Sequence, residues 1–146
     1  MRNQQGITLI ELMVVVTIVA ILAAIAYPSY QEQIRSSRRA ECSGALVNFG
    51  SAMERFYTVN GSYLGAAAGG ANTGVPAVFP GTCPVDGGDA TYNLTIQAAT
   101  AATFSLQAIP VGPQAGDKCG TFTLTNTGLK AITGASAGIT WEDCWR

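Results

Sequence analysis

Histidine is absent from this chain of 146 residues, and charged residues are scarce. Without histidine there is no imidazole, the commonest general base and a ligand of most catalytic zinc sites. Charged residues make up 12%, about half of the ~25% in an ordinary soluble domain, whereas 48% are hydrophobic. The net charge is -1, so the chain lacks the surplus of basic residues with which proteins bind phosphate backbones. An enzyme and a dedicated nucleic-acid domain are therefore disfavoured, no cofactor or metal site is predicted, and a membrane or polymer context is favoured.

The apolar segment 7–30 is the most informative feature. From Leu12 to Tyr30 it holds no charged residue, and as a helix this run is about 28 Å long, close to the hydrocarbon core of a bilayer. Glu11 lies inside the apolar stretch, where a carboxylate costs about 2.5 to 3.5 kcal/mol on insertion scales. A cleaved secretory signal, with Ala24-Ile25-Ala26 as its small-residue site, is disfavoured because the run is too long and contains Glu11.

A charge within a membrane segment requires a partner, and the run contains no lysine or arginine for Glu11. Cleavage between Gly6 and Ile7 would create a terminal amine one turn from Glu11, with an unperturbed pKa near 8. In a staggered stack of identical helices, the amine of one chain could neutralise the carboxylate of its neighbour. A membrane-anchored binding module that never polymerises is the alternative, and it leaves Glu11 unexplained.

The residues QQGITLIEL, from Gln4 to Leu12, resemble the prepilin signature of type IV pilins, and the resemblance continues through Pro28-Ser29-Tyr30. Ile7 stands where these proteins usually have Phe. The resemblance implies that a prepilin peptidase removes a leader, residues 1–6, between Gly6 and Ile7 and methylates the Ile7 amine. It also implies that Glu11 acts in assembly, with other pilin subunits, an inner-membrane platform protein and assembly ATPases as further partners.

A helix is predicted to continue over residues 31–60. Pro28 should kink or locally melt it, because proline lacks an N–H and crowds the preceding turn. The glycine of Asn60-Gly61 suits the helix end. Arginines 35, 38 and 39 are expected on a solvated face, paired with Glu32 and Glu41. An apolar stripe at spacings of three and four follows: Cys42, Ala45, Leu46, Phe49, Ala52, Met53 and Phe56.

Three alternating runs within residues 91–126 predict an antiparallel meander with one wet face, whose apolar face meets the helix stripe. Residues 61–90, rich in glycine and alanine, are expected as a loop pinned by Cys83. The predicted fold class is α+β, with a globular domain over residues 31–146. The resemblance implies the pilin fold, in which the apolar half of the long N-terminal helix, residues 7–30, protrudes and the other half packs on the sheet.

The four cysteines are too far apart in the sequence for zinc ribbons or CxxC redox sites, so an oxidised framework is expected, for which three pairings exist. The tail resembles that of PilE-type pilins, which implies that Cys119 and Cys144 close a disulfide region, residues 119–144. Cys42 shares a helix face with Leu46 and Phe49, so its thiol is expected to point toward the sheet, where the loop that carries Cys83 must pass. A bond between Cys42 and Cys83 is therefore predicted. A small buried core thiol is the alternative for Cys42.

The resemblance implies a structural subunit of a type IV pilus that serves adhesion, twitching motility or DNA uptake. Before assembly the chain would lie in the bacterial inner membrane, and afterwards in an extracellular fibre. The tail favours a minor pilin. A major pilin of the same fibre and a pseudopilin of a type II secretion system are the alternatives within the family.

Overall fold

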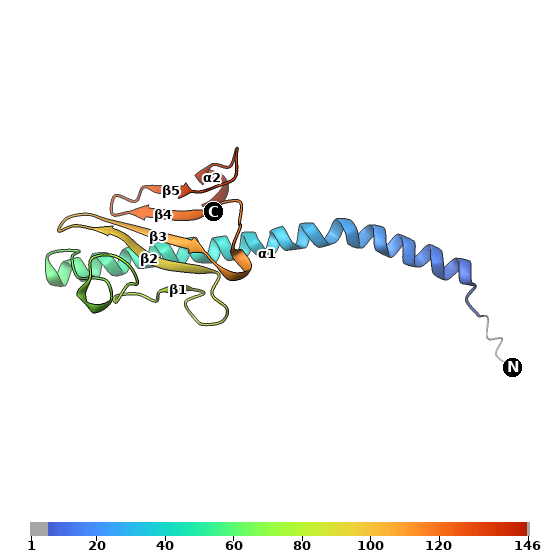
Figure 1. Cartoon of the computed structure of the whole chain (residues 1–146), viewed down its shortest axis with the longest axis horizontal. Coiled ribbons are helices and arrows are strands. Elements are labelled where there is room, and N and C mark those ends of the chain that lie inside the picture. Colours follow the sequence, from blue (N-terminus) through green and yellow to red (C-terminus); the bar gives the residue numbers. More distant parts are fainter. Residues whose placement is uncertain (1–5, 146) are drawn as a thin grey trace. The chain divides into compact units, whose positions relative to one another are not determined.

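The computed structural model describes residues 6–145 of the chain. The chain divides into two units, residues 1–34 and residues 35–146, and Figure 1 shows the helix that runs through both and the sheet of the second. In chain order, the elements are α1 (Leu9–Asn60), η1 (Ala68–Gly70), β1 (Thr82–Cys83), β2 (Tyr92–Ala99), β3 (Phe104–Pro110), η2 (Gly112–Gln114), β4 (Thr121–Thr125), β5 (Lys130–Thr133) and α2 (Trp141–Cys144).

Helix α1 ends at the predicted position. Gly61 follows it with a φ of 68°, a left-handed conformation that glycine adopts at little steric cost. The Gly61 N–H donates to the carbonyl oxygen of Tyr57 at 2.7 Å and so satisfies one of the free carbonyls of the last turn. The helix runs uninterrupted through Pro28, so the proline does not melt it, and a bend at Pro28 stays a prediction.

The sheet is an antiparallel meander in the order β1-β2-β3-β4-β5, which confirms the α+β class and the meander. It is wider than predicted, because β1 and β5 lie outside residues 91–126. Both edge strands are short, with two and four residues, too few to give a readable alternation. Cys83 pairs with Tyr92 on one edge and Ile132 with Phe122 on the other.

The hydrophobic core forms where the second part of α1 meets one face of the sheet. The predicted stripe is buried there, apart from the half-buried Phe56. The loop expected over residues 61–90 is pinned at more points than Cys83. Gly74 and Ile96 exchange backbone hydrogen bonds of 2.9 and 2.8 Å, and the Tyr63 ring packs edge-on against Phe104 at 4.9 Å. The sheet residues of the core are Cys83, Tyr92, Leu94, Ile96, Phe104, Leu106, Ala108, Phe122 and Leu124.

Candidate functional site

The residues of the N-terminal signature lie where the helix begins. Gly6, Ile7 and Thr8 precede the first turn of α1, and the N–H of Glu11 donates to Thr8 Oγ1 at 3.3 Å. Thr8 therefore caps the helix, and the Glu11 carboxylate lies in the first turn, where the positive end of the helix dipole favours a negative charge. The rest of the expected leader, residues 1–5, lies outside the described residues.

The apolar side chains that follow Glu11 are exposed around the whole circumference of the helix. Leu12 is 58% exposed, Val16 59%, and Ile25 69%. The best window in this helix has a mean hydropathy of 2.8, and the helix is long and apolar enough to cross a membrane. A helix that is apolar on every side needs a nonpolar environment from outside itself. Lipid can supply that environment, and so can other helices of the same kind.

The structure brings the four cysteines together in two pairs. Cys42 is bonded to Cys83, with 5.8 Å between the Cα atoms, and Cys119 to Cys144, with 5.9 Å. All four are buried in the core. The first bond holds edge strand β1 to the helix, and the second holds the C-terminal helix α2 to the start of β4. Each therefore fixes a segment that has few packing contacts of its own.

Trp145 packs the chain end onto the sheet. Its ring meets Phe122 edge-on at 5.4 Å, its Nε1–H donates to the carbonyl oxygen of Ala131 at 3.1 Å, and the Lys130 ammonium lies 5.1 Å from the ring centroid. The indole thus caps a backbone carbonyl of edge strand β5, which discourages pairing with a foreign strand. Thr140 and Asp143 form a capping box at the start of α2.

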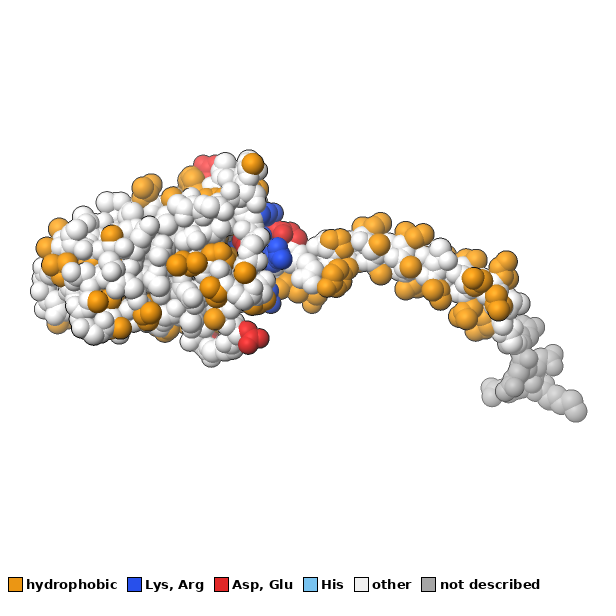
Figure 2. All heavy atoms as spheres, viewed as in Figure 1, with side chains coloured by type: hydrophobic (Ala, Val, Ile, Leu, Met, Phe, Trp, Pro, Cys, Tyr) orange, Lys and Arg blue, Asp and Glu red, His pale blue; other side chains and the backbone are white. Residues whose placement is uncertain are grey.

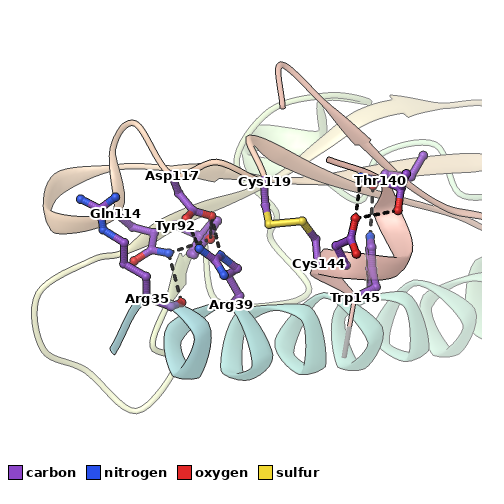
Figure 3. Close-up of a disulfide and its surroundings, with 11 residues drawn as sticks. Arg35, Arg39, Tyr92, Gln114, Asp117, Cys119, Thr140, Cys144 and Trp145 are labelled. Atoms are coloured by element: carbon purple, nitrogen blue, oxygen red, sulfur yellow. Dashed lines mark hydrogen bonds and ion pairs between the residues drawn. A yellow bond between two sulfur atoms is a disulfide. The ribbon is translucent and has the colours of Figure 1, made fainter. Parts of the chain in front are cut away.

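A buried charge pair ties the loop between β3 and β4 to α1 (Figure 3). Arg39 Nε and Nη2 donate to the two carboxylate oxygens of Asp117 at 2.8 and 2.5 Å. Gln114 Nε2 donates to the Arg35 carbonyl oxygen at 3.2 Å and to the Tyr92 hydroxyl at 3.3 Å. The loop is thereby held at several points along one stretch of the helix.

Burial and the charge of Arg39 together set the ionisation of this cluster. Burial alone would raise the pKa of Asp117, but the hydrogen bonds and charge of Arg39 outweigh it and hold that pKa below its ordinary value. Burial also raises the pKa of the Tyr92 phenol to about 12. At neutral pH the cluster therefore consists of one ion pair and a neutral phenol, which suits a structural clamp.

The prediction that Arg39 lies on a solvated face is wrong, because it is 5% exposed and paired with Asp117. The signal was present in the sequence: Arg39 precedes Cys42 by three residues and therefore continues the buried stripe. Asp117 is also 5% exposed. Its partner lies far away in the sequence, and no local pattern identifies such a pair.

The strands of the sheet contain almost no charged residues. Among the residues of β2 to β5, Lys130 alone is charged, and no charged residue lies between Asp89 and Asp117 in the sequence. Figure 2 shows the second unit as mostly uncharged on the face in view, with acidic and basic side chains gathered toward one end. The polar residues on the solvent side of the sheet include Asn93, Gln97, Ser105, Gln107 and Thr123.

Comparisons with known proteins cover both units. Residues 28–123 match a family described as the type IV minor pilin ComP, DNA uptake sequence receptor, and residues 1–27 match the prokaryotic N-terminal methylation motif. The family match confirms the predicted relationship to pilins and favours a minor pilin. The description of this family names a DNA receptor, a function that the net charge of -1 does not predict.

Two curated relatives match over about a third and about half of the chain. The type IV major alpha-pilin of Moraxella bovis is 53% identical over 32% of this chain and 30% of its own. Prepilin peptidase-dependent protein D of Escherichia coli is 40% identical over 53% and 51%. The chain thus spans about a third to a half of these relatives. The non-core minor pilin PilV of Neisseria meningitidis, 23% identical, superimposes with a TM-score of 0.50 over 71% of this chain and 93% of its own, which shows a shared fold.

Proposed function

This chain belongs to the family of the type IV minor pilin ComP, and on that premise we propose that it is a minor structural subunit of a type IV pilus. Its N-terminal segment holds the precursor in the inner membrane and later packs among the equivalent segments of other pilin subunits. The observation that carries this proposal is the apolar helix, exposed on all sides and led by Glu11. Such a helix requires partners that its own chain does not supply.

Processing is part of the same proposal. A prepilin peptidase cleaves between Gly6 and Ile7 and methylates the new amine, in keeping with the N-terminal methylation motif. The amine of one subunit then neutralises Glu11 of a neighbour. A platform protein and assembly ATPases drive the polymerisation, as in the family that this chain resembles.

Quantitative mass spectrometry of sheared surface fibres tests this assignment. We expect peptides of this chain in the fibre fraction, with an N-terminal peptide that begins at methylated Ile7 and in amounts far below those of the main subunit. If this chain dominates the fraction, it is a major pilin. If it stays in the membrane fraction while fibres are abundant, the pilus assignment is wrong.

Receptor activity for DNA is the second function that we propose, because the matched family is described as a DNA uptake sequence receptor. The low charge of the chain then requires a binding mode that relies little on phosphate neutralisation. The test is selection by the full mature chain in detergent micelles from duplexes with a random core. Enrichment of one sequence motif is expected, and no enrichment over empty micelles would rule this function out.

A further inference from the structure

The hairpin of β2 and β3 combines exposed polar side chains with a complete lack of charge. No carboxylate in its strands or turn would repel a phosphate. Amide and hydroxyl groups are the uncharged groups with which proteins contact base edges and phosphates. The inference drawn from this hairpin rests on the proposed DNA receptor function, and it identifies the surface and the mode of recognition.

A β-bulge sets Gln97 apart from the other residues of the sheet. Ile96 pairs with Leu106 and Ala98 with Ser105, so Gln97 is the extra residue in β2. Bulges bend a strand and redirect a side chain, and they are frequent beside functional sites. The Ser105 hydroxyl donates to Gln97 Oε1 at 2.8 Å. This bond orients the exposed amide, and it leaves both N–H donors and one lone pair of the carbonyl oxygen for a ligand.

The turn that follows is held rigid by its own hydrogen bonds. Thr100 N–H donates to the Thr103 carbonyl oxygen at 2.8 Å, and Thr100 Oγ1 accepts from the N–H groups of Thr103 and Ala102 at 2.9 and 3.2 Å. Small side chains occupy the rest of the tip, at Ala98, Ala99, Ala101 and Ala102. A rigid tip with small side chains loses little conformational entropy on binding and allows close approach to a ligand.

We propose that this tip, residues 97–105, enters the major groove of duplex DNA and that Gln97 contacts a base edge there. The major groove is about 12 Å wide and admits a two-stranded β-ribbon. A glutamine amide can bond adenine at N6 and N7 together, and alanine methyl groups can contact the methyl group of thymine. The exposed amide at the bulge and the methyl groups of the tip supply both kinds of contact.

An uncharged recognition element predicts an unusual salt response. The observed affinity for duplex DNA falls with salt in proportion to the number of phosphates neutralised, with a slope of about -0.9 for each one. The nearest cations in the sequence, Arg55 and Lys118, lie outside the hairpin. We therefore expect weak binding with a shallow slope, and sequence preference that persists at salt concentrations that abolish most basic DNA-binding surfaces.

The test compares variants of the full mature chain in detergent micelles against the duplex that the wild-type chain selects. Gln97→Ala should reduce the preference for one base pair of the motif by about 5- to 140-fold, the range for one bidentate contact. Gln107→Ala is the matched control, because it removes the same amide from a half-buried position in the middle of the same face. It should leave the preference unchanged.

A charge series at Ala101, which is exposed in the turn, tests the surface independently of Gln97. Ala101→Glu should weaken binding at least tenfold, Ala101→Gln should change it little, and Ala101→Lys should tighten it and steepen the salt slope by about 0.9. If the wild-type chain selects a motif and all these variants keep its affinity and preference, the hairpin is not the reading surface although the DNA function stands. If the wild-type chain selects nothing, the DNA function itself is wrong.

Discussion

The two parts of α1 place their apolar side chains in different environments, although they belong to one helix. In residues 35–60 the apolar residues form a stripe, and the sheet of the same chain buries it. In residues 9–34 apolar residues surround the helix and remain exposed. A stripe indicates a partner on one side, within the chain, whereas an apolar surface on every side indicates partners outside it. The periodicity thus distinguishes the part that folds from the part that we propose to assemble.

The largest effect that we expect from this difference is at Glu11. Glu11→Ala should leave the precursor processed and held in the membrane but reduce its incorporation into fibres by tenfold or more, because the terminal amine of a neighbour would be unpaired in a nonpolar surrounding. Immunoblots of sheared fibres and of membranes measure the two pools. The globular unit should unfold as in the wild-type chain.

Glu11→Gln is the matched variant, since it keeps the shape and the hydrogen-bonding capacity of the side chain but not its charge. It should also incorporate poorly if neutralisation of the amine is what matters. Wild-type incorporation of both variants would overturn the assembly role of Glu11.

In the globular unit, loss of the buried ion pair should have the largest effect. Arg39→Met leaves the Asp117 carboxylate buried without its bidentate partner, which typically costs about 3 to 5 kcal/mol. The fluorescence of the two tryptophans, Trp141 and Trp145, follows urea unfolding of this unit. The double variant Arg39→Met with Asp117→Leu should recover most of the loss, because a packed apolar pair can replace a buried ion pair. A cost below about 1 kcal/mol for the single variant would show that the pair is not effectively buried.

The disulfides should contribute on a similar scale. Their residues are 25 and 41 positions apart in the sequence, so the chain-entropy estimate gives about 3.5 kcal/mol for Cys119 with Cys144 and about 4 kcal/mol for Cys42 with Cys83. Replacing either pair by serine should lower the urea midpoint, while the membrane insertion of the precursor stays unchanged. Peptide mapping without reductant checks the pairs directly: a peptide that links Cys42 to Cys144 would contradict them.

Acid should weaken the globular unit through Asp117. Its folded pKa lies below the reference value of 3.8, so between these two values the unfolded chain binds a proton that the folded chain does not. The stability contributed by this carboxylate is therefore present above about pH 4 and is lost as the pH falls through the folded pKa. Asp117→Asn should flatten the pH dependence of the unfolding free energy between pH 5 and pH 2. An unchanged slope would mean that other carboxylates dominate.

The sequence was sufficient to predict the helix end at Asn60, the apolar stripe and the central strands, because each depends on local chemistry and a regular spacing. It did not reveal the edge strands β1 and β5, whose pairing depends on longer neighbours, or the pair of Arg39 with Asp117, which are 78 positions apart. The bulge at Gln97 was also missed, since it depends on how Ser105 and Leu106 pair across the hairpin. Local signals thus predicted the framework, and tertiary contacts decided the details of the candidate site.

The smallest effect that we expect tests whether the two units are independent. Pro28→Ala restores a backbone N–H and removes a ring that crowds the helix, a change worth up to about 3 kcal/mol in local helix stability. Because Pro28 belongs to residues 1–34, the urea midpoint of the globular unit, followed by tryptophan fluorescence, should move by less than the equivalent of about 0.5 kcal/mol.

Gly44→Ala is the control in the same helix but in the other unit. It meets nothing within 4 Å and should stabilise that unit by about 0.5 to 1 kcal/mol. A shift as large for Pro28→Ala as for Gly44→Ala would show that the assembling part and the folding part of α1 are energetically coupled.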